Sequence, residues 1–197
     1  MNDNQGGASG PKRTGSDAMN DLRLGAARKR LAESRNQEEA IDSLREIAAT
    51  FLGSEEIGLF RVDREASTFP VLGSFGIDLD KYDLMRALGD AGLRRVMSGE
   101  CHVEIPPRER SGARAKVQAF IPIRLASHTI AILAIFRLLP QKVAFDRSDL
   151  ELFKLLSDEA AKPLFGSRAY SKPGTEGRRS DEPEVSEAEL NDPGMRA

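Results

Sequence analysis

With 197 residues, 40% of them hydrophobic, and no Trp, the chain is long enough for one ordinary domain and for tails outside its core. Its 29 basic and 31 acidic residues nearly cancel, which argues against a dedicated nucleic-acid binder, because such proteins usually concentrate a basic excess on one face. One Cys and two His cannot supply the four ligands of a structural zinc site, and they allow no internal disulfide bond.

The hydropathy pattern indicates the compartment. The longest apolar run, residues 130–136, is far too short to cross a bilayer, and residues 1–16 lack the features of a secretory signal. We therefore expect a cytoplasmic protein with no membrane insertion, no metal and no cofactor.

Both ends of the chain are predicted to be disordered. Residues 1–20 contain four Gly and little that is apolar, and residues 167–197 are polar and interrupted by three Pro. Ordering such segments costs conformational entropy that no apolar burial offsets.

Residues 21–35 predict a basic helical extension. Leu24, Ala27 and Leu31 lie at i, i+3 and i+7, and five basic residues outnumber two acidic ones around them. We expect this stripe to pair with a second copy in a homodimer, as the start of a helix continuing to Leu52. An acidic partner or a membrane surface would also suit the charge.

The first half of the expected domain, residues 36–166, begins with an amphipathic helix. Residues 38–52 place apolar side chains at helical spacing, and Gly53 follows where a left-handed C-cap is typical. Residues 57–62 and 69–75 predict the two strands of a β-hairpin. Residues 79–97 then predict one helix, or two shorter ones because Gly89 and Gly92 weaken its middle.

The second half of the domain predicts three strands and a last helix. The strands cover residues 101–105, 117–125 and 128–138, with Pro122 at an edge or a bulge. The third is apolar on both faces, which is typical of a central strand covered on both sides. Asp146 and Asp149 then stand at the N-cap and N3 positions of a helix that ends at Pro163 and Gly166. The order α-ββ-α-βββ-α indicates an α+β fold, an antiparallel sheet with flanking helices.

Three local patterns in this order resemble the GAF domain family over residues 36–166. They are Arg-Val-Met-Ser-Gly-Glu at 95–100, the Pro-containing strand at 119–123, and the apolar strand at 130–135 with the Phe-Asp helix entry at 145–152. The resemblance implies a sensory module that binds small molecules or partner proteins, often as a helix-linked dimer. It does not imply which ligand, since one fold supports many functions.

Cys101-His102 is the one pair that could carry chemistry. Bilin-binding members of the superfamily have a Cys-His pair before the Pro-containing strand, and stand-alone GAF proteins include methionine sulfoxide reductases. That reductase chemistry needs a resolving Cys, and the chain has one Cys in all. We interpret Cys101 as a structural strand residue beside a surface His, and we assign no catalytic residue.

The segment from Pro106 to Lys116 is the candidate ligand lid. It contains four basic side chains, Arg108, Arg110, Arg114 and Lys116, and one acidic side chain. In GAF-like folds this connection lies across the pocket mouth, so a basic lid would favour an anionic ligand or an acidic partner. A solvated loop between two strands is the simpler interpretation.

These observations leave three hypotheses for function. The first is a non-enzymatic GAF-type sensory module that binds a small molecule or a partner protein in signal transduction. The second is a ligand-free adaptor that uses the fold for docking or dimerisation, and the third is a small redox enzyme dependent on Cys101. A polar-lined pocket would favour the first, and a space filled by Phe and Leu would favour the second.

Overall fold

The computed structural model describes residues 15–79, 82–103 and 117–166. Its elements are, in chain order, α1 (Gly15–Glu33), α2 (Gln37–Ile47), the π-helical turn η1 (Ala48–Leu52), β1 (Glu56–Arg61), β2 (Val71–Phe75), α3 (Leu84–Met97), β3 (His102–Val103), β4 (Ala119–Leu125), β5 (His128–Arg137), α4 (Arg147–Glu159) and α5 (Ala161–Phe165). The predicted α+β fold is confirmed.

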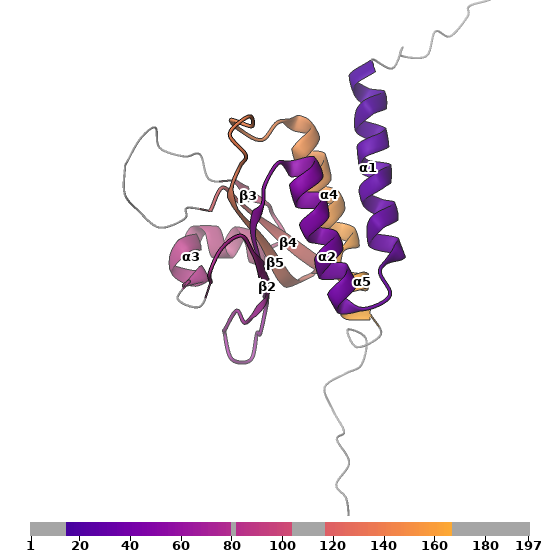
Figure 1. Ribbon diagram of the computed structural model, residues 1–197. Helices are drawn as coiled ribbons and strands as arrows, with labels where there is room; N and C mark the ends of the chain where they lie inside the picture. The colour runs from indigo at the N-terminus through magenta and orange to yellow at the C-terminus, as the bar shows by residue number, and fades with distance from the viewer. Residues whose placement is uncertain (1–14, 80–81, 104–116, 167–197) are drawn as a thin grey trace, which may run out of the picture.

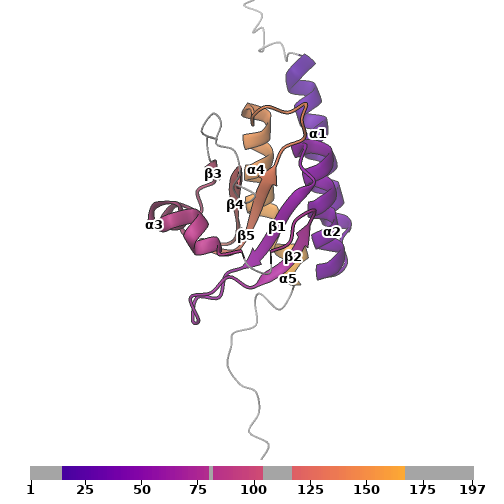
Figure 2. The same ribbon diagram turned by 60° about the vertical axis from the view of Figure 1, so that its left-hand side comes forward.

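The strands form one antiparallel sheet in the order β2-β1-β5-β4-β3. Helices α1, α2, α4 and α5 lie on one side of it and α3 lies on the other, as Figures 1 and 2 show. The predicted hairpin is the antiparallel pair β1–β2, and the predicted central strand is β5, which lies between β1 and β4.

Strand β5 divides the apolar core into two parts. Leu133 and Ile135 belong to the core on the side of α1, α2, α4 and α5. Ile132, Ala134 and Phe136 belong to the core under α3. Successive side chains of a strand point to opposite faces of the sheet, which divides these five residues between the two cores. All five are buried because helices cover both faces.

Local signals in the sequence determine where the helices begin and end. Gly53 has φ +64°, the left-handed conformation expected of the residue after a helix. Asp146 caps α4 by accepting a hydrogen bond from the Asp149 backbone N–H, and the Asp149 carboxylate accepts one in return from the Asp146 N–H. Pro122 pairs in register with Ile132, and the shift in strand register lies one residue further on, between Ile123 and Arg124, so the bulge is near Pro122 but not at it.

Three predicted boundaries were wrong. Helix α1 begins at Gly15, inside the segment 1–20 that was expected to be disordered, and it ends at Glu33. The helix expected to run on to Leu52 is therefore interrupted before α2, where Asn36 forms a new N-cap. Helix α5 continues past Pro163, which is accommodated in the first turn, where its missing N–H is not needed, and ends at Gly166 as predicted.

Helix α3 combines the two alternatives left open for residues 79–97. It is one element from Leu84 to Met97, but Gly89 has φ +60° and ψ 174°, which kinks it. Among the described residues, no helix combines the length and the apolar character that a bilayer crossing requires.

Candidate functional site

The space between the sheet and α3 is the first place to look for a ligand, and apolar side chains fill it. Phe60, Phe120 and Phe136 rise from the strands, and they meet buried Leu and Val side chains at Leu79, Leu84, Leu88, Val96 and Val117. The ring of Tyr82 stands edge-on to Phe136 at 5.0 Å between centroids. The buried side chains of this core are therefore apolar throughout its described part.

Gly58 shows how tightly this core is packed. A Cβ atom on Gly58 would lie 2.5 Å from Cδ1 of Leu79 and 3.2 Å from a ring carbon of Phe136. Such distances are below van der Waals contact, so the strand backbone itself lies directly under Leu79. A larger residue here would have to displace the end of the Leu79 side chain, so glycine allows its close approach to the strand.

An open hollow of about 390 Å³ lies at the rim of this core. It is bounded by the loop between β1 and β2 and by the start of α3, with Ser67, Thr68, Phe69, Tyr82, Asp83, Leu84 and Met85 as its lining. The predicted lid residues Arg108, Arg110, Arg114 and Lys116 lie outside the described residues.

Cys101 and His102 do not form a reactive pair. Cys101 packs against the core that α4 covers, whereas the ring of His102 stacks on Phe120 at 6.3 Å between centroids, under α3. Burial, with a smaller contribution from the Asp158 carboxylate, raises the pKa of the Cys101 thiol to about 11. A thiol of this kind is a poor nucleophile, because the thiolate is the reactive form. These observations support the structural interpretation of Cys101.

The described residues also contain no group of three or more His, Cys, Asp or Glu side chains placed to hold a metal ion.

A buried carboxylate connects α1 to the rest of the domain. Asp149 of α4 is fully buried, and its Oδ1 atom accepts hydrogen bonds from Arg23 of α1 at 2.5 Å and from Lys142 at 2.7 Å. The guanidinium of Arg23 also donates to the Ser148 hydroxyl at 2.7 Å and to the carbonyl oxygen of Phe51 at 2.5 Å. One arginine thus links α1 to both α4 and η1. The sequence patterns indicated Asp149 as a helix cap and missed this second role.

Other basic residues of α1 also have acidic partners within the chain. The Arg28 guanidinium donates to both carboxylate oxygens of Glu159 at 2.8–3.0 Å, which raises the pKa of Arg28 further above its ordinary value. Arg30 pairs with Glu46 of α2. The basic character of this helix is therefore largely explained by contacts within the domain.

The premise of the predicted dimer seam is wrong. Ala27 and Leu31 are buried in the apolar core of their own chain, and Leu24 packs against the same core. Leu152 and Leu155 of α4 are buried in the same core. The stripe on α1 was expected to lack a cover within its own domain, but α2 and α4 provide one.

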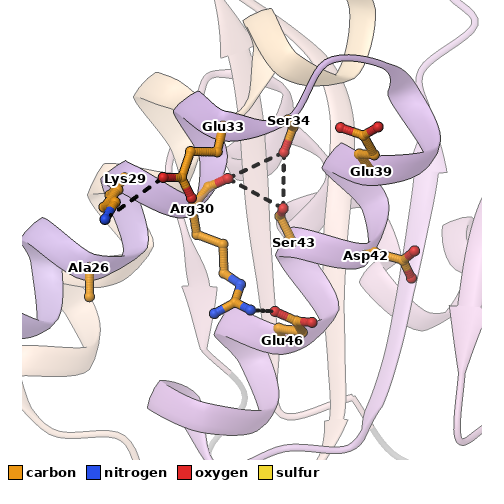
Figure 3. Close-up of a pocket in the computed structure, with 9 residues that line it drawn as sticks. All are labelled: Ala26, Lys29, Arg30, Glu33, Ser34, Glu39, Asp42, Ser43 and Glu46. Carbon is orange, nitrogen blue, oxygen red and sulfur yellow. Dashed lines mark hydrogen bonds and ion pairs between the residues drawn. The ribbon is translucent and has the colours of Figure 1, made fainter.

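A second open hollow, of about 490 Å³, lies between α1 and α2 (Figure 3). At its centre the Ser34 and Ser43 hydroxyls lie 2.9 Å apart, and both lie within hydrogen-bond distance of the carbonyl oxygen of Arg30. With one proton each, one hydroxyl donates to the other, and the accepting hydroxyl donates to the carbonyl. Figure 3 also shows the ion pairs that Lys29 and Arg30 make there with Glu33 and Glu46. Because Lys29 and Arg30 already pair with carboxylates, the hollow offers little to attract an anionic ligand.

Solved GAF domains have the same fold. One belongs to a phosphoenolpyruvate-protein phosphotransferase from Coxiella burnetii, with a TM-score of 0.58 and 21% identity over 78% of this chain and 98% of that chain. The GAF domain of an Acinetobacter phosphoenolpyruvate-protein phosphotransferase gives 0.55 and 13%, over 79% and 98%. That of the potassium sensor histidine kinase KdpD from Escherichia coli gives 0.51 and 15%, over 76% and 98%.

The chain therefore has a GAF-type fold, as its sequence patterns predict. No protein-family model matches the sequence, and no curated protein matches it either. At these identities the resemblance concerns the fold, and function has to be argued from this chain's own residues.

Proposed function

We propose that the chain is a non-enzymatic regulatory module of signal transduction that acts in the cytoplasm by docking on another protein surface. The observation that supports this proposal is the filled space between the sheet and α3, where Phe60, Phe120 and Phe136 pack against Leu84 and Leu88. A binding site for a small molecule is usually a preformed concave pocket with a few polar groups, and this core has the opposite character.

The redox hypothesis has less support. Cys101 is the single Cys of the chain, its thiol pKa is raised to about 11, and His102 faces the other side of the sheet. A peroxide-reducing or sulfoxide-reducing cysteine needs the opposite environment, one that favours the thiolate.

A small-molecule sensor is the second candidate, because of the hollow beside Tyr82 and Phe69. A ligand there would rest on the rim of the α3 core rather than enter it.

Native mass spectrometry of the full chain purified from its source separates the two candidates. We expect the mass of the polypeptide alone, or of its complex with protein, and no retained small molecule. The contrary result is one small molecule per chain that is lost in Tyr82→Ala, which alters the hollow, and kept in Leu22→Ala. Leu22 is a matched control because it is 70% exposed on α1, on the other side of the sheet.

A further inference from the structure

Helix α3 presents three exposed cations that have no acidic partner among the described residues. They are Arg86, Arg94 and Arg95, and we call them the α3 arginine surface. The same helix contains one acidic residue, Asp90. By contrast, each arginine of α1 pairs with a carboxylate of its own chain. The charges of α1 therefore serve the fold, whereas those of α3 remain available.

Helix stability explains only part of this surface. Arg94 and Arg95 lie in the last turn of α3, where cations are favourable beside the negative end of the helix dipole. Arg86 lies in the first turn, where the same dipole disfavours a cation. An exposed cation at that end gains nothing from the described chain, so it favours an anionic group from elsewhere.

Apolar surface lies beside Arg86. Its neighbour Met85 is 45% exposed and lines the open hollow of about 390 Å³, together with Phe69 and Tyr82. The start of α3 thus offers apolar contact next to a cation. A segment that fits it carries apolar side chains interspersed with carboxylates.

The carboxyl-terminal part of the chain has this chemistry in its sequence. Residues 181–192 contain six acidic residues, no basic residue, and the apolar side chains of Val185 and Leu190. Acidic blocks near a chain terminus are often interaction segments, even where they cannot form a core of their own. We call residues 181–192 the acidic segment.

We propose that the acidic segment docks on the α3 arginine surface of its own chain. Residues 167–180 connect it to the last described residue, Gly166, which follows α5 on the other side of the sheet. Fourteen residues can span up to about 45 Å. A domain of this size has a radius of gyration of about 15 Å, so the connection is long enough to reach around the edge of the sheet.

The tether favours this occupant over a separate acidic protein. A flexible connection keeps the acidic segment at an effective concentration in the millimolar range, so a weak contact is sufficient for docking. The proposal goes beyond the proposed function, and its test needs the chain alone. A partner protein with acidic residues would compete with the acidic segment for the same arginines.

Amide hydrogen–deuterium exchange of the full chain tests the proposal. One variant converts the carboxylates of the acidic segment to amides: Asp181→Asn, Glu182→Gln, Glu184→Gln, Glu187→Gln, Glu189→Gln and Asp192→Asn. We expect residues 84–97 to exchange about fivefold faster in this six-amide variant, because a docked segment stabilises the helix in proportion to its effective concentration over its Kd. The amides of α1 should not change. Every described residue is the same in both proteins.

Two matched pairs of substitutions separate docking from a general effect of charge. Arg178→Gln with Arg179→Gln alters the same end of the chain with the opposite sign, and it should not accelerate exchange in α3. On the helix, Arg94→Gln with Arg95→Gln should abolish the difference between the original chain and the six-amide variant.

Arg35→Gln with Arg64→Gln is the control for the helix substitutions, because both arginines are exposed and lie outside α3. This pair should preserve the difference. Raising the salt concentration from about 0.05 to 0.5 M should accelerate exchange at 84–97 in the unaltered chain and leave the six-amide variant unchanged. That salt series does not depend on any variant of the folded domain.

Three outcomes would overturn the proposal. The first is equal exchange at 84–97 in the original chain and the six-amide variant. The second is a difference that falls on another helix instead of α3, or that survives Arg94→Gln with Arg95→Gln. The third is protection of α3 that disappears on dilution, which would mean that the acidic segment docks on a different copy of the chain.

Discussion

The two faces of the sheet are covered in different ways. On one face, α1, α2, α4 and α5 share a large apolar core that extends from Ala27 to Leu164. On the other face, α3 alone closes a smaller core built around three Phe rings, and Gly89 kinks that helix. A core held by several elements resists rearrangement, whereas one kinked helix can move to follow a change beneath it.

The multi-helix face also depends on an ion pair, whereas on the α3 face the buried Thr129 hydroxyl of β5 donates a neutral hydrogen bond to the carbonyl oxygen of Val96 at 2.8 Å. Helix α1 has 19 residues but buries only Ala27 and Leu31, so apolar contact alone attaches it weakly. Arg23 supplements that contact by reaching the buried carboxylate of Asp149. One face is therefore stabilised by packing together with a buried ion pair, and the other by packing together with a neutral hydrogen bond at the end of α3.

The largest expected effects come from truncating one buried side chain of β5 on each face of the sheet. Ile135→Ala should lower the free energy of unfolding by about 4 kcal/mol, and Ile132→Ala by about 3 kcal/mol. Position along β5 alone would favour the larger loss at Ile132, nearer the strand centre. The packing reverses that order, because the helices over Ile135 cannot collapse into the cavity.

Urea denaturation with a shared m-value measures both losses. Equal losses, or a larger loss at Ile132, would contradict the difference in rigidity between the faces. A loss below about 1 kcal/mol for both would mean that β5 is not a central strand.

The next effect comes from the buried ion pair. Asp149→Asn should cost about 3 kcal/mol, because two cations, Arg23 and Lys142, then lose the charge that compensates their burial. Glu159→Gln is the matched control: it removes a carboxylate that pairs with α1 at the surface, where the Arg28 side chain is 58% exposed. That change should cost less than about 1 kcal/mol.

Chemical denaturation at neutral pH measures both variants, and amide exchange in α1 shows where the loss falls. We expect the amides of α1 to lose protection in Asp149→Asn before those of β5 do. If the two carboxylate variants cost the same, the buried pair would have no special role in holding α1.

The strands and helix caps could be predicted because their signals are local. The apolar run at 130–136 indicated a central strand, and the Asp residues at 146 and 149 indicated a helix start. The docking of α1 could not be predicted in this way. Arg23 and Asp149 are 126 positions apart, and a stripe of three small or medium apolar residues does not reveal whether it faces its own domain or another.

The packing inside the α3 core could not be predicted from the sequence either. The pattern indicated which side chains are apolar, but it could not show that Leu79 lies directly on Gly58. That contact depends on how α3 and the segment before it cross the sheet. The sequence therefore left both alternatives open, a polar pocket or an apolar core, and the structure was needed to choose between them.

A smaller effect concerns Asp146, the N-cap of α4. A hydrogen bond from the Ser148 hydroxyl at 2.6 Å is the main reason that the pKa of Asp146 lies below its ordinary value. A carboxyl with a lowered pKa in the folded state stabilises the protein above its unfolded pKa, and that contribution is lost as the pH falls below about 4.

Two variants of Asp146 separate the cap from its charge. Asp146→Asn keeps the acceptor, so the melting temperature at pH 7 should change little while its fall toward pH 3 becomes shallower. Asp146→Ala removes the acceptor and should cost about 1 kcal/mol at pH 7. Thermal melts from pH 7 to about pH 3 measure both. Parallel acid profiles for Asp146→Asn and the original chain would show that this carboxyl does not contribute to acid sensitivity.

The smallest expected effect is at Cys101, where the two faces meet at the beginning of β3. Cys101→Ser should cost about 1 kcal/mol or less and leave docking unchanged, because the side chain is only half-buried and serves as packing.

With the thiol pKa raised to about 11, roughly one molecule in ten thousand carries the thiolate at pH 7. An aromatic disulfide reagent should therefore react with the folded chain about a hundredfold more slowly than with the chain in urea. Asp158→Asn removes the nearby carboxylate, the smaller cause of the raised pKa, and should accelerate the reaction modestly. Rapid reaction of the folded chain at pH 7, together with loss of function in Cys101→Ser, would instead support a redox role and contradict the assignment of this thiol to packing.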